Sequence, residues 1–203
     1  FECLGFKDIP SERTLYRDLE RIGIKYRFIL EKYQQILKKN NLADKKQFAD
    51  FSSSYFEGEK AELGALGYSR DSQPGKKQLT FGISTGMNGI PTALTIQKGN
   101  VCDKKHFKIM LKISSKVLEK GSLIVFDCGG NSEDNKKKII DLGFNYLTLR
   151  PRQKETYKRY IKIYKETIKE IFYINDIKYK CVKVKGEGVK YIFHSKELYK
   201  KLK

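Results

Sequence analysis

The order of strand and helix patterns between residues 47 and 150 constrains the fold of this 203-residue chain more than any other feature. Strand patterns occupy 48–54, 78–85, 90–97, 123–126 and 144–149, and helix patterns occupy 103–120 and 133–142. Asn88-Gly89 is a strong hairpin signal between the second and third strands. The continuous apolar run 123–126 is typical of a central parallel strand. This order, β-β-β-α-β-α-β, predicts an α/β fold with one mixed sheet and helices packed against it.

Residues 9–39 predict two helices. Ser11 is a suitable N-cap for the first helix, and Gly23 suits its C′ position. The apolar face of this helix consists of Leu15, Leu19 and Ile22, and its outward basic residues are Arg13, Arg17 and Arg21. The second helix is expected to turn six side chains inward: Tyr26, Ile29, Leu30, Tyr33, Ile36 and Leu37. The pair is either a DNA-binding helix-turn-helix or a plain helical hairpin packed on the core.

The helices of the 47–150 segment are amphipathic. The inward side chains expected in 103–120 are Phe107, Met110, Leu111, Ile113, Val117 and Leu118. For 133–142 we expect Ser132 as N-cap, Gly143 as the end, and an inward face of Ile139, Ile140 and Leu142.

The pattern of residue types in the sequence changes after Pro151. Residues 153–170 predict a charged helix, 171–193 predict two or three short strands, and 195–203 predict the opening of another helix. We therefore expect three parts. They are a helical segment at 1–46 that is a candidate for DNA binding, an α/β core at 47–150, and a basic, partly β-rich region at 151–203.

The formal charge of +18 is far larger than solubility requires. Residues 151–203 alone hold 16 Lys and Arg against 6 Asp and Glu. Such an excess is the electrostatic footprint of proteins that bind nucleic-acid phosphates. The alternative is a solvated lysine surface with no such partner.

The cysteines are scattered (Cys3, Cys102, Cys128, Cys181), and only two histidines accompany them. We therefore expect neither a structural zinc site nor a disulfide framework. No apolar run is long enough to span a membrane, and no signal peptide is visible. The chain begins at Phe1, so we expect a fragment of an intracellular, cytoplasmic protein.

Two aspartates, Asp50 and Asp127, each close a predicted strand. A carboxylate in such a place is costly unless a cation or hydrogen bonds compensate it. Two of them on neighbouring strands form the usual cradle for Mg²⁺ in phosphoryl-transfer enzymes. The local alternatives are that Asp50 bonds the amides of Ser52 and Ser53, and that Asp127 forms the turn before Gly129.

Five short motifs follow one another along the chain. They are Asp50 through Gly58, Gly67-Tyr68-Ser69-Arg70-Asp71 with Gln78, Gly89-Ile90-Pro91, Gly99-Asn100-Val101-Cys102-Asp103, and Asp127-Cys128-Gly129 followed by Asn135. With the order of elements, they resemble the ribonuclease-H-like core of DDE transposases of the insertion-sequence-four group. The resemblance covers about residues 45–150 well and the flanks loosely. Each motif alone is weak, whereas five in the right order are specific.

The resemblance implies DNA transposition, in which hydrolysis at the element ends precedes strand transfer into target DNA. Asp50 and Asp127 would be the catalytic residues and would hold two Mg²⁺ or Mn²⁺ ions. Arg13, Arg17 and Arg21 would contact phosphates of double-stranded DNA. The resemblance also implies that the protein acts as a homodimer in the synaptic complex.

The family also requires a third acid, a glutamate in a Tyr-x-x-Arg-x-x-x-Glu helix. No tyrosine of this chain has that spacing. The remaining candidates are Glu155, Glu166, Glu170, Glu187 and Glu197. We expect instead that the glutamate lies beyond Lys203, so that this chain is C-terminally truncated, holds metal poorly and does not cut DNA alone.

Three further residues are candidates for supporting the aspartates. Asn100 and Asp103 are expected to orient the core near Asp50, although an N-cap role for Asp103 explains the pattern equally well. Asn135 is a candidate partner of Asp127, although such an Asn is more commonly exposed. We assign no role to His106.

Two alternative functions remain: an inactive DNA-binding remnant of a transposase, and a standalone ribonuclease-H-like nuclease completed by an acid such as Glu197. Haloacid-dehalogenase phosphatases are excluded because they need Asp-x-Asp, and here Ser52 and Gly129 stand at the second acid's position. The Gly-x-x-x-x-Gly-Lys phosphate loop of nucleotide hydrolases is missing.

Overall fold

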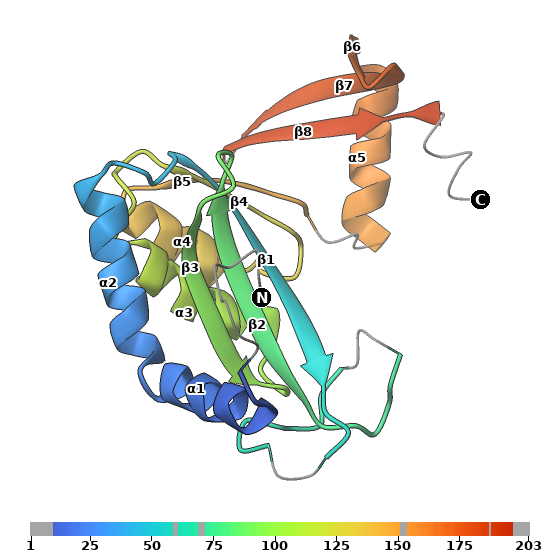
Figure 1. Ribbon diagram of the computed structural model, residues 1–203. Coiled ribbons are helices and arrows are strands. Elements are labelled where there is room, and N and C mark those ends of the chain that lie inside the picture. Colours follow the sequence, from blue (N-terminus) through green and yellow to red (C-terminus); the bar gives the residue numbers. More distant parts are fainter. Residues whose placement is uncertain (1–9, 59–60, 69–71, 151–153, 187, 197–203) are drawn as a thin grey trace. The chain divides into compact units, whose positions relative to one another are not determined.

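The computed structural model describes residues 10–58, 61–68, 72–150, 154–186 and 188–196. The chain divides into two compact units, residues 1–150 and 151–203, which we call the core unit and the tail unit (Figure 1). The helical segment at the N-terminus therefore belongs to the same compact unit as the sheet that follows it.

The core unit is built on a five-stranded sheet with the strand order β3-β2-β1-β4-β5 (Figure 1). Its strands are β1 (Lys46–Tyr55), β2 (Gln78–Gly86), β3 (Pro91–Lys98), β4 (Leu123–Phe126) and β5 (Asn145–Thr148). The pairs β1–β2 and β2–β3 are antiparallel, whereas β1–β4 and β4–β5 are parallel. The mixed sheet predicted from the sequence is therefore confirmed.

The turn at Asn88-Gly89 joins β2 to β3. Gly89 has a φ of +75°, which glycine adopts without the steric cost that a Cβ would bring. The Asn88 side chain accepts a hydrogen bond from the main-chain N–H of Ile90 at 3.1 Å. Local turn chemistry thus sets the register of this hairpin, as the sequence predicts.

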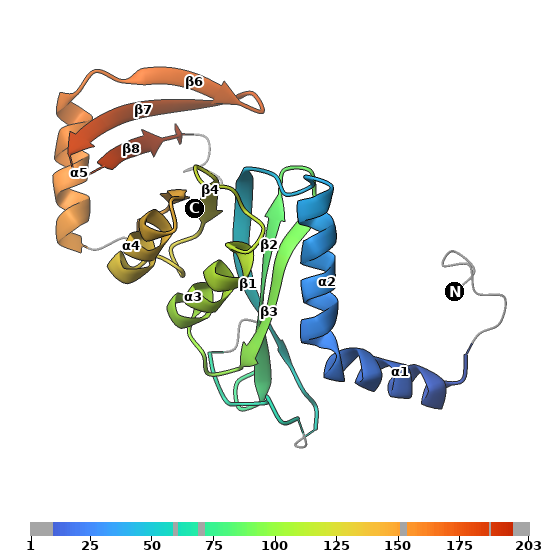
Figure 2. The ribbon, with the colours of Figure 1, turned by 90° about the vertical axis from the view of Figure 1, so that its left-hand side faces the viewer.

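The hydrophobic core lies between the sheet and the helices α3 (Asp103–Ser114) and α4 (Glu133–Asp141), which cover one face of the sheet (Figure 2). Phe107 of α3 is fully buried, and its ring centroid lies 4.5 Å from that of Phe126 on β4. Every second residue of β1 points into this layer, where Ala49 and Phe51 are buried. The buried hydrophobic core therefore lies on one face of the sheet only.

The opposite face of the sheet carries apolar side chains that remain exposed. Pairing places Phe48, Ile83 and Leu147 on this face, with 45%, 39% and 53% of their surfaces exposed. Helix α2 (Tyr26–Lys39) stands on this side, beside β3 (Figure 2). The middle of the face is open in the described part of the chain.

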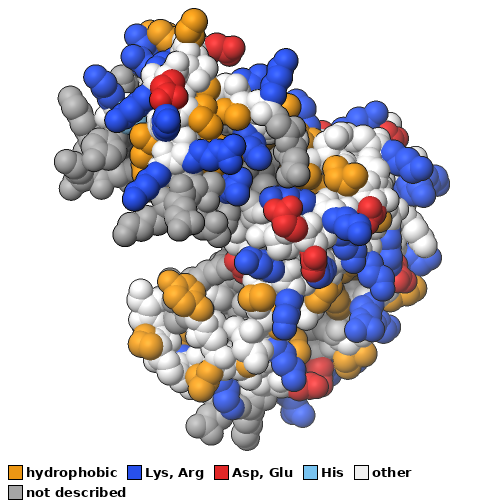
Figure 3. All heavy atoms as spheres, turned by 180° about the vertical axis from the view of Figure 1, so that it is seen from behind, with side chains coloured by type: hydrophobic (Ala, Val, Ile, Leu, Met, Phe, Trp, Pro, Cys, Tyr) orange, Lys and Arg blue, Asp and Glu red, His pale blue; other side chains and the backbone are white. Residues whose placement is uncertain are grey.

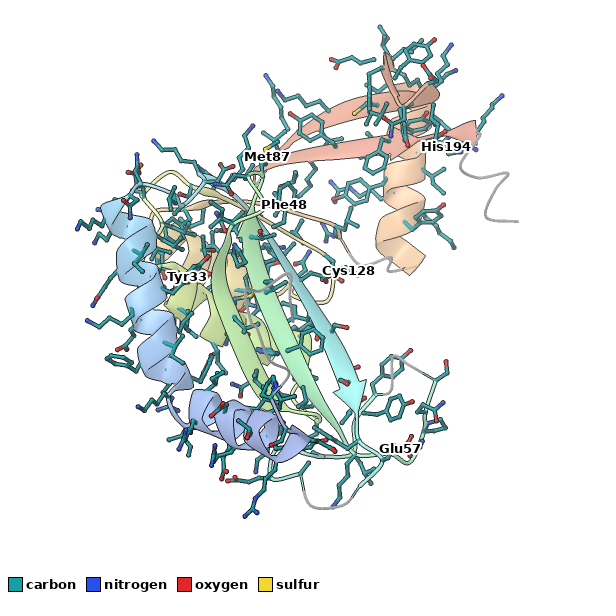
Figure 4. The ribbon with its side chains drawn as sticks, viewed as in Figure 1. Tyr33, Phe48, Glu57, Met87, Cys128 and His194 are labelled. Atoms are coloured by element: carbon teal, nitrogen blue, oxygen red, sulfur yellow. The ribbon has the colours of Figure 1, made fainter. Side chains whose placement is uncertain are left out.

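Helix α2 protects the edge strand β3, because its side chains bond the carbonyl groups of that strand. Tyr26 donates to Leu94, Tyr33 (Figure 4) donates to Pro91, and Gln34 donates to Thr92, at 2.8, 2.8 and 3.0 Å. Burial raises the pKa of Tyr26, so this hydroxyl keeps its proton well into alkaline pH. Covering an edge strand in this way blocks unwanted pairing with other chains.

The helix pair differs from the sequence expectation in three ways. Ser11 is the N-cap of α1 (Glu12–Ile24) as predicted, but Gly23 lies inside the helix and Lys25 is its C-cap. The expected inward residues Ile29 and Ile36 are exposed, and polar Gln34 is buried in their place. No residue of α1 is buried, so its apolar stripe meets solvent. Tertiary packing decides these outcomes, because α2 touches the sheet along a narrow line.

The other two helices of the core unit keep their predicted inward faces with two corrections. Helix α3 ends at Ser114, and a turn carries the chain on to the buried Val117. Ser132 caps α4 as predicted, but Ile140 is 54% exposed because α4 turns Asn135 and Ile139 to the core instead.

The tail unit consists of a helix and a three-stranded antiparallel sheet. Its elements are α5 (Lys154–Glu166), β6 (Glu170–Ile174), β7 (Ile177–Gly186) and β8 (Gly188–His194), with the strand order β6-β7-β8. Asn175 and Asp176 both have positive φ, as the turn of a two-residue hairpin requires. The helix expected at 195–203 falls almost wholly outside the described residues.

Within the described ranges, no helix combines the length and the apolar character needed to span a membrane.

Candidate active site

Asp50 and Asp127 come together across the parallel pair β1–β4. The last paired residues of these strands are Ala49 and Phe126, and each aspartate is the next residue along its chain. Parallel neighbours lie about 4.8 Å apart, so the two aspartates stand side by side at one level of the sheet. Because Ala49 and Phe126 are buried against the helices, alternation turns both aspartates to the open face.

Both carboxylates are exposed, and each accepts main-chain hydrogen bonds. Asp50 Oδ1 accepts from the N–H of Phe51 at 2.8 Å, rather than from the amides considered as an alternative. Asp127 Oδ1 accepts from the N–H groups of Gly129 and Gly130 at 2.9 and 3.4 Å. Asp127 therefore does form the turn, but a carboxylate has two oxygens and about four acceptor positions. The turn leaves it able to bind a cation as well.

Strand β5 and the loop after β4 hold the main chain of Asp127 in place. The Thr148 hydroxyl donates to the carbonyl oxygen of Asp127 at 2.9 Å. In the same loop, which Figure 4 marks at Cys128, the buried Asn131 donates to the carbonyl of Leu149 at 2.8 Å. Asp127 thus sits one residue past the end of its strand and still has a fixed backbone.

Gly129 lets Asp103 approach Asp127 closely. A Cβ at Gly129 would lie 2.6 Å from Asp103 Oδ2 and 3.2 Å from Asp127 Oδ1. The sequence suggested Asp103 as a neighbour of Asp50 or as an N-cap. The N-cap of α3 is Cys102 instead, and Asp103 is the first helical residue. Both carboxylates therefore lie beside the main chain of Gly129, in space that a side chain at this position would fill.

Asn135 is fully buried, contrary to the exposure that is common for such a residue. Its side-chain amide donates to the carbonyl oxygens of Gly130 and Lys104, at 2.8 and 3.1 Å. It therefore ties the Asp127 loop to the first turn of α3 and does not touch Asp127 itself. Asn100 is exposed and lies in the turn between β3 and α3.

The donor set at Asp50 and Asp127 suits Mg²⁺ or Mn²⁺. Mg²⁺ keeps several water ligands and is commonly bound by one or two carboxylates together with substrate phosphates. Two exposed carboxylates on an open sheet face meet that requirement. The described residues contain no cluster of three His, Cys, Asp or Glu side chains that would hold a metal by themselves.

The candidates for a third acid lie in the tail unit or outside the described residues. Glu155, Glu166 and Glu170 lie in the tail unit. Glu187 and Glu197 lie outside the described residues.

Basic side chains occupy helices of the core unit. Arg13, Arg17 and Arg21 are exposed along α1, where Arg21 pairs with Asp18 at 3.2 Å. The sequence reasoning missed a second basic surface on the outer sides of α3 and α4, part of the face shown in Figure 3. Its exposed lysines are Lys104, Lys105, Lys112 and Lys137, whereas Lys108 and Lys136 pair with Asp134 and Glu133 at 3.2 and 2.9 Å. Spacing of three to four residues along a helix is the signal that would have revealed it.

Two buried polar residues of the core unit have structural roles that the sequence did not reveal. His106, to which the sequence assigned no role, is fully buried and lies 2.7 Å from Thr95 Oγ1 through its Nε2 atom. Gln78 is buried and donates to the carbonyls of Tyr68 and Gly99. Both residues join segments distant in sequence, so the sequence motif that contains Gln78 does not reveal which groups these side chains contact.

The three described cysteines are free thiols. Burial raises the pKa of Cys181, and the carboxylate of Glu170 on the neighbouring strand raises it further. This thiol therefore stays protonated at neutral pH, which disfavours nucleophilic chemistry at this residue.

No protein-family model matches this sequence, and no curated protein matches it. Transposase complexes are among the solved structures that are similar to the chain at low sequence identity. One is a piggyBac transposase synaptic complex with hairpin DNA, with a TM-score of 0.41, 12% identity, and coverage of 75% of this chain and 33% of that one.

Two others are complexes of the Mos1 transposase. The paired-end complex with the left transposon end has a TM-score of 0.36 and 11% identity, over 78% of this chain and 56% of that one. The pre-cleavage transpososome has a TM-score of 0.32 and 9% identity, over 66% of this chain and 52% of that one. This chain thus spans between a third and somewhat more than half of the structures it resembles. TM-scores below 0.5 do not establish a common fold, so the function proposed for this chain rests on its own residues.

Proposed function

We propose that the core unit is the ribonuclease-H-like catalytic core of a DDE transposase of the insertion-sequence-four group, acting on the phosphodiester bonds of double-stranded DNA. The parallel register of β1 and β4 carries this proposal, because it sets Asp50 and Asp127 side by side on an exposed sheet face. The five ordered motifs and the charge of +18 support it.

The chemistry follows from where the two aspartates stand. When bound at Asp50 and Asp127, Mg²⁺ or Mn²⁺ would polarise the phosphodiester and lower the pKa of attacking water. The chain's own residues would hold these carboxylates at a fixed separation, with Thr148 securing Asp127 from β5. The open face leaves room for a DNA backbone, and the basic helices would attract it. The proposal also includes the partners of the protein. These are double-stranded DNA at the element ends and at the target, and a second copy of the chain in a homodimer.

A Mn²⁺ titration by calorimetry tests the proposed site. We compare the whole chain with Asp50→Asn, Asp127→Asn and, as a matched control, Asp141→Asn at the exposed end of α4. Removal of a ligand should weaken Mn²⁺ binding at least tenfold in the first two variants, on the scale seen for altered metal sites. The control should bind like the wild-type chain.

Equal Mn²⁺ affinity in all four proteins would refute the aspartate pair as a metal site. Because the third acid has no assigned residue, we expect the wild-type affinity itself to be low, so the titration extends to millimolar metal. No binding there would show that two carboxylates are insufficient without a third.

A further inference from the structure

Helix α1 carries an apolar stripe that the core unit leaves uncovered. Leu15, Leu19 and Ile22 recur at the spacing of one helical face, and Leu19 and Ile22 are 62% and 55% exposed. Tyr16, which lies beside them, is 65% exposed. Figure 2 shows that α1 extends away from the sheet, and none of its residues is buried. The stripe is therefore open to a partner.

A bare helix of this length needs a partner to be stable. Helix α1 has 13 residues, and isolated helices shorter than about 12–15 residues are marginal in water. The Ser11 cap and the exposed ion pair between Arg21 and Asp18, at 3.2 Å, each add only modest stability. Most helical stability in proteins comes from packing of the apolar face. Helix α1 therefore gains most of its stability when another apolar surface covers its stripe.

The charges beside the stripe select the partner. Because a helix has about 3.6 residues per turn, Asp18 and Lys25 lie on the same flank of the stripe, almost two full turns apart. Asp18 lies near the middle of α1, and Lys25 is its C-cap. The flank therefore carries opposite charges at its two ends. An identical flank that runs in the reverse direction is its electrostatic complement.

We propose that the apolar stripe of α1 docks on the same stripe of a second copy of this chain, with the two helices antiparallel. Two-fold symmetry then buries Leu19 and Ile22 against their counterparts and places Asp18 of each copy near Lys25 of the other. This inference rests on the homodimer included in the proposed function and names the surface that forms it. Because the stripe is short, the interface is at the small end of known interfaces, and the dimer should dissociate on dilution.

Nucleic acid is a poor occupant of the stripe. Phosphate contacts come from cations and hydrogen-bond donors, whereas the stripe offers apolar side chains with the acids Glu12 and Asp18 beside it. Arg13 and Arg17 lie on the opposite side of the helix. Antiparallel docking therefore leaves these arginines of both copies on the outside, where they remain accessible to DNA phosphates.

Sedimentation equilibrium of the whole chain without DNA tests this inference. The proteins are wild type, Leu19→Glu and, as a matched control, Ile140→Glu at an exposed apolar position of α4. Wild type should show a reversible monomer–dimer equilibrium between submicromolar and high micromolar concentrations. Leu19→Glu should raise the dimer Kd at least about tenfold, because docking would bury an unpaired charge. The control should match wild type, and circular dichroism checks that all three proteins are folded.

Charge exchange tests the antiparallel arrangement. Asp18→Lys and Lys25→Asp alone should each raise the dimer Kd about threefold or more, because each places like charges together across the two-fold axis. The double variant exchanges the two charges and should return the Kd towards the wild-type value. Since the double variant also lacks the ion pair between Asp18 and Arg21, its recovery would come from the contact between the two copies.

The outcomes separate this inference from the proposed function. A wild-type chain that stays monomeric throughout would overturn the inference, whereas the Mn²⁺ titration, which needs no dimer, still tests the metal site. A dimer that survives Leu19→Glu would use another surface, which would overturn the α1 interface and keep the homodimer. Dissociation by Leu19→Glu without recovery in the double charge variant would overturn the antiparallel pairing.

Discussion

At the scale of single residues, the position of Asp127 depends on groups that do no chemistry. The aspartate lies beyond the last ladder pair of β4, so the sheet itself does not hold its carbonyl. Thr148 provides that hold from β5. Catalytic geometry is commonly maintained by such supporting hydrogen bonds.

Thr148→Val should weaken Mn²⁺ binding about tenfold, because the Asp127 carbonyl loses its partner while the side-chain shape is nearly kept. Thr148→Ser keeps the hydroxyl and should restore the affinity. Calorimetric titration measures both. Identical affinities for valine and serine would show that the Thr148 bond does not position Asp127.

Gly99→Ala should destabilise the fold by at least about 2 kcal/mol, because its Cβ would collide with main-chain oxygen atoms that cannot move freely. Gly58→Ala is the matched control, since a Cβ there has no atom within 4 Å. We expect the control to change stability by less than about 0.5 kcal/mol. Urea unfolding monitored by circular dichroism measures the free energy of unfolding of both variants. Equal values for Gly99→Ala and Gly58→Ala would show that Gly99 is not closely packed.

At the scale of elements, a row of hydrogen bonds from polar side chains holds α2 against the edge of the sheet. Gln34 is 4% exposed and bonds the carbonyls of Thr92 and Ile113, which joins α2 to β3 and to α3. Leu37 is the buried apolar side chain beside it on α2. Edge protection therefore depends more on hydrogen bonds than on apolar burial.

Gln34→Leu should lower the free energy of unfolding by about 1–3 kcal/mol, since the substitution leaves buried carbonyl oxygens unsatisfied. Gln35→Leu, at the exposed neighbouring position, should have little effect. Chemical denaturation of the two variants provides the comparison. A stability for Gln34→Leu equal to wild type would mean that water satisfies these carbonyls.

At the scale of the whole molecule, the excess of positive charge is spread over both units, and the tail unit carries more than half of it. The arginines of α1 lie opposite its apolar stripe and are exposed. A charge distribution of this kind acts through phosphate neutralisation and counterion release, which makes binding depend on salt.

Combined replacement of Arg13, Arg17 and Arg21 by alanine should weaken DNA binding at low salt. The slope of log affinity against log salt should fall by about one for each DNA phosphate that the variant no longer neutralises. Asp18→Ala should act in the opposite direction, because it frees Arg21 from its ion pair. Anisotropy titrations across salt concentrations give the slopes. Unchanged slopes in the triple variant would remove α1 from the DNA interface.

The sequence by itself determined the elements whose causes are local. Side-chain capping at Ser11 and Ser132 and the Asn88-Gly89 turn depend on residues within a few positions of one another. Alternation along β1 and the apolar run of β4 likewise reflect which face each residue presents. The mixed sheet, and with it the proximity of Asp50 and Asp127, could therefore be anticipated from pattern and order.

Only the tertiary structure decided which polar residues are buried and which apolar ones are not. Gln34, His106 and Asn135 are buried, and each side chain makes a hydrogen bond with a group from a distant segment. Ile36 and Ile140 are exposed because their helices meet the sheet along one narrow line each. The approach of Asp103 to Asp127 likewise depends on the space left by Gly129. Hydrogen bonds and close approaches between distant residues leave no periodic trace in a sequence, and for that physical reason these contacts emerged only from the folded chain.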